Sequence, residues 1–86
     1  MITVAYKPSF IRQYQKLPVL LQDEVREKIA LFLSDPHLAS LRTHKLRGRL
    51  KGFSSFSVNY QFRIVFTFKG KNRAVLHAVG DHAVYG

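Results

Sequence analysis

Cysteine is absent from this chain of 86 residues, which excludes a disulfide scaffold and any thiolate metal site. No apolar run approaches the roughly 18 residues that a membrane-spanning helix needs. The first residues also lack the basic segment followed by an apolar segment that marks a secretory signal. From these three absences we expect a cytoplasmic protein.

Acidic residues are scarce and unevenly placed. The chain has 5 Asp and Glu against 14 Lys and Arg, a net charge of +9. Four of the acids lie in residues 1–35, whereas residues 36–80 hold nine bases and no acid. Such a charge keeps a small protein soluble, but an acid-free stretch of this length favours a nucleic-acid partner.

Histidine spacing gives no sign of a metal site. The four histidines include no pair placed four residues apart on one predicted helix, the arrangement typical of zinc ligands. We therefore expect no metal and no other cofactor.

The first half of the chain predicts one strand and two helices. Apolar residues alternate over residues 2–6, as in a short strand, and recur at helical spacing over 8–17 and 19–34. Pro18 separates the two helices, and Pro36 ends the second. Because the break is so short, we expect an antiparallel helical hairpin.

The second half predicts a loop and then three strands. Residues 37–52 show no clear period, whereas residues 55–60, 62–68 and 73–79 alternate between apolar and polar side chains. The element order is therefore β-α-α-β-β-β. It predicts one α+β domain over residues 1–86, with the helical hairpin packed on a small, mainly antiparallel twisted sheet.

One predicted strand has four apolar residues at strict alternation, namely Phe62, Ile64, Phe66 and Phe68. Aromatic side chains of this kind can stack on RNA bases, but the strict alternation favours a core face packed against the helices. Arg63 is the only charged residue of this strand, and it falls on the opposite face.

Two stretches of the sequence resemble the RelE/ParE toxin superfamily. Residues 44–53 (HKLRGRLKGF) and 57–66 (SVNYQFRIVF) are similar to the family pattern "L-x-G-x-L-x-G-aromatic" followed by "Y/F-R-[LI]-[VI]-[YF]". Residues 79–85 (VGDHAVY) resemble the ending "G-[TD]-H-x-x-[VI]-Y", and the Leu-Pro break before the second helix also fits. The resemblance therefore extends over nearly the whole chain.

The resemblance implies the toxin of a type II toxin–antitoxin system. In the RelE, YoeB and YafQ branch, such a toxin is a metal-independent endoribonuclease that cuts messenger RNA in the ribosomal A site and inhibits translation. The histidines at 44 and 82 favour this branch. The alternative is a toxin of the same fold without ribonuclease activity, either a ParE-like gyrase poison or a catalytically decayed homologue that still binds an antitoxin.

Cleavage of RNA without a metal needs a base for the 2′-hydroxyl, an acid for the leaving oxygen, and cations for the phosphorane charge. The resemblance assigns Arg63 to the scissile phosphate, His44 to the general base and His82 to the general acid. It assigns the final aromatic of the motif to Tyr85, which would stack on a base or assist the acid. As structural alternatives, Arg63 would be an edge charge that discourages aggregation, and both histidines would be exposed residues without a role.

The sequence also departs from the family pattern. Two residues separate His82 from Tyr85, where many relatives have three. Ala78 stands where some relatives carry a catalytic arginine, and Ser57 and Gln61 stand where the YafQ-like branch has His and Asp. These departures are the reason why a decayed toxin remains an alternative.

The expected partners are RNA and an antitoxin. We expect messenger RNA in the ribosomal A site and ribosomal RNA to contact a basic set formed by Lys45, Arg47, Arg49, Lys51 and Arg73. The antitoxin should be acidic, with a partly disordered segment that folds onto the basic sheet face. A plain basic RNA-binding domain, which would not be toxic, is the remaining reading.

Overall fold

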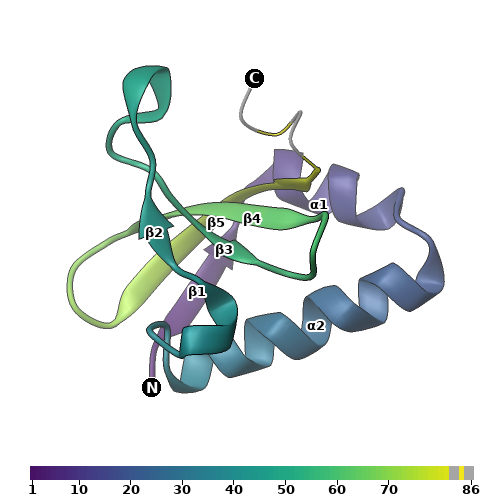
Figure 1. Ribbon diagram of the computed structural model, residues 1–86, viewed down its shortest axis with the longest axis horizontal. Coiled ribbons are helices and arrows are strands. Elements are labelled where there is room, and N and C mark those ends of the chain that lie inside the picture. Colours follow the sequence, from purple (N-terminus) through teal and green to yellow (C-terminus); the bar gives the residue numbers. More distant parts are fainter. Residues whose placement is uncertain (82–83, 85–86) are drawn as a thin grey trace.

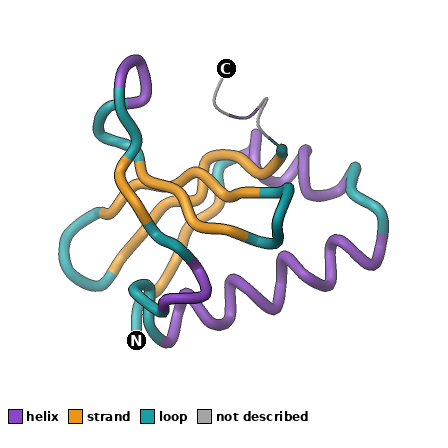
Figure 2. Tube along the Cα trace, viewed as in Figure 1, coloured by secondary structure: helices purple, strands orange, loops and turns teal. Residues whose placement is uncertain are grey.

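The computed structural model describes residues 1–81 and 84. Within them, two helices pack on a five-stranded mixed sheet (Figures 1 and 2). In chain order the elements are β1 (Thr3–Tyr6), α1 (Pro8–Gln15), α2 (Val19–Ser34), η1 (Ala39–Leu41), β2 (His44–Lys45), η2 (Gly48–Leu50), β3 (Ser54–Ser57), β4 (Arg63–Phe68) and β5 (Arg73–Gly80), where η marks a single 3-10 turn. The predicted α+β class is confirmed.

The strands lie in the order β1-β5-β4-β3-β2, so β1 and β5, the first and last strands of the chain, are neighbours. β1 runs parallel to β5, and the other three pairs are antiparallel, which confirms a mainly antiparallel sheet. A parallel pair needs a long crossover between its strands, and in this chain everything from α1 to β4 supplies it.

The core lies between the helices and one face of the sheet. α2 buries Val25, Ile29 and Phe32, which recur at helical spacing. The Phe32 ring stacks on Phe56 of β3 with centroids 4.3 Å apart and meets Phe66 of β4 edge-on at 4.8 Å. The predicted core stripe of β4 is therefore confirmed at its centre, whereas Phe68 at the end of the strand is 41% exposed.

α1 is tied to the end of β5 by two polar side chains. The Ser9 hydroxyl donates to the backbone oxygen of His77 at 2.6 Å, and the backbone N–H of Val79 donates to Oε1 of Gln13 at 2.9 Å. α2 then returns along the molecule after the turn at residues 16–18 (Figure 1). Gln22 closes that turn by donating to the backbone oxygen of Tyr14 at 2.9 Å.

The structure corrects three predictions for the second half of the chain. Residues 37–52 are not simply a loop, because they contain β2 and two 3-10 turns. The strand predicted to reach Tyr60 ends at Ser57, since Asn59 accepts the backbone N–H groups of Gln61 and Phe62 and closes a turn instead. The helix predicted over residues 8–17 ends at Gln15.

β5 also contains a bulge that the alternation did not predict. Val65 pairs with Ala78, but the next residue of β4, Phe66, pairs with Leu76. His77 is therefore the extra residue. A bulge changes the direction of the side chains beside it. Here it places the side chains of two consecutive residues, His77 and Ala78, on the same face of the sheet as Val65 and Thr67 of β4.

No helix among residues 1–81 and 84 has the length and apolar character needed to cross a bilayer.

Candidate functional site

Arg63 lies on the face of the sheet turned away from the helices. Ile64 and Phe66 of the same strand are fully buried in the core, so the alternate residues of β4 point to the other side. There Arg63 pairs with Ser57 of β3, and its Nη1 donates to the Ser57 hydroxyl at 3.0 Å. This bond fixes the guanidinium of a partly buried arginine. The predicted orientation of Arg63 is confirmed.

Arg63 lines a polar hollow of about 480 Å³ at the end of the sheet where the β3–β4 turn begins. Two further cations line it. Lys28 belongs to α2, and Arg42 is the residue that follows η1. The remaining lining residues are Ser40, Ser57, Val58, Asn59 and Tyr60. Three cations from three elements thus surround one hollow, and the sequence signal that marked Arg63 did not mark Lys28 or Arg42.

His44 lies on β2 and shares a sheet face with Arg63. His44 pairs with Ser55, and Arg63 pairs with Ser57, two residues further along β3 on the same side of the strand. The imidazole Nδ1 lies 2.9 Å from the backbone oxygen of Arg42. Since a carbonyl oxygen only accepts, Nδ1 is the donor in this contact, and Nε2 is the ring nitrogen left free of it.

His44 does not, however, line the hollow of Arg63. It lines a neighbouring hollow of about 900 Å³, together with Lys45, Arg47 and Lys51 of the predicted basic set. The structure thus brings His44 and Arg63 to one face of the sheet, two strands apart, without placing their side chains in one cavity.

The predicted residues His82 and Tyr85 lie outside the described part of the chain.

The predicted basic set divides into two groups. Lys45 ends β2, and Arg47, Arg49 and Lys51 belong to the segment between β2 and β3, which projects from the sheet as an arm (Figure 1). Arg73 begins β5 beside the last residues of β4, whereas Arg63 begins β4, so the two arginines lie at opposite ends of this strand pair. Arg73 is therefore separated from the candidate site.

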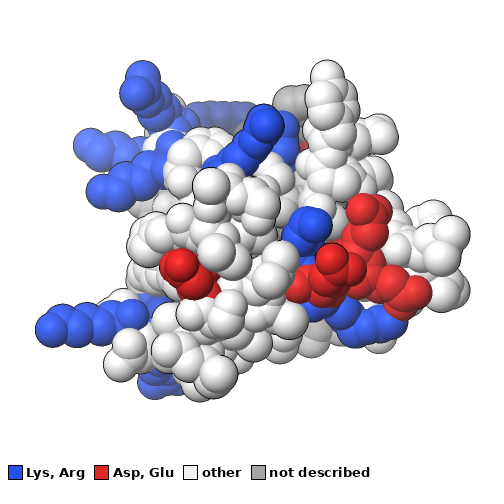
Figure 3. Space-filling model, turned by 60° about the horizontal axis from the view of Figure 1, so that its bottom comes forward, with Lys and Arg blue, Asp and Glu red and all other residues white. Residues whose placement is uncertain are grey.

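Charge is segregated on the surface. Figure 3 shows many Lys and Arg side chains on the left of the view and most of the acidic side chains in one cluster on the right, with a few basic side chains beside that cluster. Three of the five acids, Asp23, Glu24 and Glu27, lie on α2. The sheet face and the arm are thus left with a strongly positive field.

His77 lies at the bulge of β5 in a partly buried polar cluster. Its Nε2 lies 2.9 Å from the Thr67 hydroxyl, and its ring meets Phe53 edge-on with centroids 5.0 Å apart. Burial lowers the pKa of His77 below the ordinary 6.5, and the charges of Lys7 and Lys69 lower it further. The neutral ring is therefore favoured, as expected for a structural histidine. The sequence analysis gave it no catalytic role.

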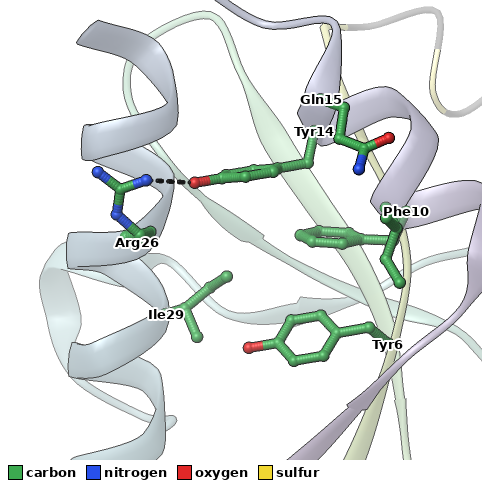
Figure 4. A pocket seen from close by; sticks show the side chains of 7 residues that line it. Tyr6, Phe10, Tyr14, Gln15, Arg26 and Ile29 are labelled. Atoms are coloured by element: carbon green, nitrogen blue, oxygen red, sulfur yellow. Dashed lines mark hydrogen bonds between the residues drawn. The ribbon is translucent and has the colours of Figure 1, made fainter. Parts of the chain in front are cut away.

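An apolar hollow of about 370 Å³ lies between α1 and α2 (Figure 4). Tyr6, Phe10, Tyr14 and Ile29 point into it, and burial raises the pKa of Tyr6, with a smaller contribution from Tyr14. The one cation of its lining, Arg26, donates to the Tyr14 hydroxyl and forms an ion pair with Asp23. The hollow therefore has no unengaged cation for a phosphate.

Within residues 1–81 and 84, no three His, Asp or Glu side chains lie together in a group that could hold a metal ion.

Comparison with solved structures identifies the fold. The YoeB/ParE toxin from Agrobacterium tumefaciens superposes with a TM-score of 0.76 and 19% identity, over 95% of this chain and 99% of that one. YafQ from E. coli gives 0.76 and 16% over 99% and 98%, and the toxin–antitoxin complex RelBE2 from Mycobacterium tuberculosis gives 0.78 and 23% over 94% and 98%. No known family profile and no curated protein matches the sequence. At these identities the likeness establishes the fold: the chain has the RelE-like fold of the RelE, YoeB and YafQ toxins.

Proposed function

We propose that this chain with the RelE-like toxin fold is the toxin of a type II toxin–antitoxin pair and cleaves messenger RNA on the ribosome. The observation that carries the proposal is Arg63, a partly buried arginine on the open sheet face, held by Ser57 and joined in one hollow by Lys28 and Arg42. A cluster of this kind suits a phosphodiester because guanidinium groups can contact two phosphate oxygens at once.

In this mechanism Arg63 holds the scissile phosphate. Charge builds up on the non-bridging oxygens as the 2′-oxygen attacks phosphorus, and a cation already fixed in place stabilises that charge without reorganising. The bond from Arg63 to Ser57 supplies the fixation. The negative charge of the transition state therefore needs no metal ion in this proposal.

His44 is the proposed general base. The contact of its Nδ1 with the Arg42 carbonyl orients the ring and leaves Nε2 able to accept the 2′-hydroxyl proton. Because His44 and Arg63 line neighbouring hollows, the RNA would have to cross the sheet face between them. His82 is the proposed general acid and Tyr85 the proposed stacking or assisting aromatic, both by resemblance to the family motif.

The proposed partners follow from the same surface. Messenger RNA and ribosomal RNA would contact the cationic arm between β2 and β3, which projects from the sheet. An antitoxin is the other proposed partner, and RelBE2, one of the similar structures, is itself a toxin–antitoxin complex. We propose an acidic antitoxin segment that folds onto the positive sheet face, and a cytoplasmic location for both proteins.

The test is controlled expression of the wild type and of Arg63→Gln, His44→Ala and His82→Ala variants. Growth would be followed together with primer extension on a reporter messenger RNA. We expect growth arrest and new 5′ ends inside translated codons in the wild type, with both lost in the variants. Arrest without new 5′ ends would contradict the ribonuclease proposal and favour the gyrase-poison alternative. Absence of arrest with soluble protein would favour the decayed homologue.

A further inference from the structure

The hollow beside Arg63 has features that clamping a single scissile phosphate does not require. Lys28 and Arg42 come from parts of the chain remote from β4, and both face the same space of about 480 Å³. That volume falls in the range of roughly 300–1,000 Å³ typical of small-ligand sites. The space therefore has room for more of an RNA strand than the phosphate that Arg63 holds.

Two cations of this hollow, Lys28 and Arg42, have no carboxylate in direct contact among the described residues. No carboxylate among residues 1–81 and 84 pairs with Lys28 or Arg42, and the ion pair found there joins Arg26 to Asp23. Glu24 lies close by, but its Oε1 accepts from the Asn59 side chain at 2.9 Å, and Glu24 does not line the hollow. Because like charges repel, three cations around a hollow that no carboxylate lines are stabilised by an anionic ligand.

Tyr60 stands at the tip of the β3–β4 turn beside these cations, with 98% of its surface exposed. The turn is well ordered, because Oδ1 of Asn59 accepts the backbone N–H groups of Gln61 and Phe62, both at 2.8 Å. The backbone N–H of Val58 also donates to the oxygen of Phe62 at 2.9 Å. An aromatic ring so fully exposed contributes little to the core, and a rigid turn presents it at low cost in conformational entropy.

We propose that this hollow binds one nucleotide of single-stranded RNA adjacent to the scissile phosphate. Lys28 and Arg42 hold its phosphate, and the Tyr60 ring stacks on its base. The inference rests on the proposed function, since it takes Arg63 as the clamp of the neighbouring phosphate. An acidic protein segment would use the cations equally well but would leave Tyr60 unexplained, whereas phosphate charge beside a flat aromatic surface is the usual pattern of single-strand recognition.

The test is a titration of the labelled protein followed by amide NMR, with uridine 3′-monophosphate as the nucleotide probe and inorganic phosphate as the phosphate-only probe. The nucleotide should shift the resonances of residues 40–42 and 57–60. Arg42→Ala should weaken binding of both probes about tenfold. Tyr60→Ala should weaken binding of the nucleotide at least fivefold and leave the affinity for phosphate unchanged. Tyr60→Phe should retain nucleotide binding. Lys71→Ala, in the exposed β4–β5 turn, is the matched control for a lost cation.

Several outcomes would overturn the proposal. One is an absence of binding at millimolar nucleotide. Others are shifts confined to another face, or equal affinities for Arg42→Ala and Lys71→Ala. Stronger shifts with a polyglutamate peptide that are insensitive to Tyr60→Ala would assign the hollow to a protein partner instead. The assay measures binding, so it separates the two proposals. Nucleotide binding in this hollow without messenger RNA cleavage would support the subsite and contradict the proposed ribonuclease activity. Cleavage without binding in this hollow would support the ribonuclease activity and contradict the subsite.

Discussion

At the scale of single residues, one hydrogen bond holds each of the two groups that matter most for the proposed chemistry. The Ser57 hydroxyl orients Arg63, and the Arg42 carbonyl orients the His44 ring by accepting from Nδ1. Neither partner needs to react. Each restricts a group that acts in the proposed mechanism, which is how preorganised sites lower the barrier to reaction.

The first residue-scale prediction concerns the charge of Arg63. Arg63→Gln should lower the rate of messenger RNA cleavage by roughly 100- to 1,000-fold, the usual effect of removing one donor to a developing negative charge. Arg63→Lys should recover only part of the rate, because an ammonium lacks the planar fork that contacts two oxygens. Cleavage on programmed ribosomes measures both. A Lys71→Gln control should cleave like the wild type, and an equal loss in that control would contradict the assignment.

The second residue-scale prediction concerns His77 and pH. Its pKa is lowered in the folded protein by burial and by two lysines, so the unfolded chain binds the proton more tightly. The stabilising effect of the neutral ring is present above pH 6.5, the unfolded value, and is lost as pH falls toward the folded pKa. The free energy of unfolding should therefore decrease as pH falls below 6.5.

Urea denaturation at several pH values measures this effect. The decrease should be smaller in His77→Gln than in the wild type, because glutamine does not titrate. His37→Gln, at an exposed position, is the control and should follow the wild type. Parallel pH curves for the wild type and His77→Gln would rule out His77 as the origin.

At the scale of elements, α2 serves two surfaces at once. Its inner side supplies the core through Phe32, while Lys28 reaches the hollow of Arg63. The same helix also carries Asp23, Glu24 and Glu27. The helix therefore holds the β3–β4 turn in place through packing, and the Glu24–Asn59 bond adds to this.

An element-scale prediction tests the packing of α2. Phe32→Ala should destabilise the fold by roughly 3–5 kcal/mol, because it removes a fully buried ring that contacts Phe56 and Phe66 and leaves a cavity. Val19→Ala, at a 70% exposed position of the same helix, should change stability by about 0.5 kcal/mol or less. Urea denaturation measures both. Similar losses for the two variants would contradict the packing argument.

At the scale of the whole molecule, charge is the dominant property. The net charge is +9, and three of the five acids lie on α2, so basic residues predominate over the rest of the chain. Binding to RNA should therefore be driven in large part by release of counterions from the strand.

The molecule-scale prediction is a salt dependence. The affinity for a short single-stranded RNA should fall linearly with salt on logarithmic axes. Each lost phosphate contact should reduce the slope by about 0.7. Replacing Arg47 and Lys51 of the arm by glutamine should thus reduce the slope by about 1.4. The control pair Arg12→Gln and Lys16→Gln, on and after α1, removes the same charge and should leave the slope nearly unchanged. Equal slopes for the two double variants would show that the arm makes no specific contribution.

Much of this protein was determined by the sequence alone. Helical spacing predicted the bounds of α2 correctly, alternation predicted β4 and placed Arg63 on the open face, and the resemblance predicted the fold. These features depend on short-range periodicity, which each segment carries within itself. The alternation wrongly predicted a strand as far as Tyr60. The Asn59 side chain accepts a backbone N–H group and forms a turn there, so β3 ends earlier and the Tyr60 ring is exposed.

Only the tertiary structure decided which charges meet. Lys28, Arg42 and Arg63 lie far apart in the sequence, and the register of β2 and β3 together with the packing of α2 brings them around one hollow. The bulge at His77 and the separation of Arg73 from Arg63 likewise follow from strand pairing. The physical reason is that pairing register and helix docking are set by contacts between distant segments, and those contacts leave no periodic mark on the segments themselves.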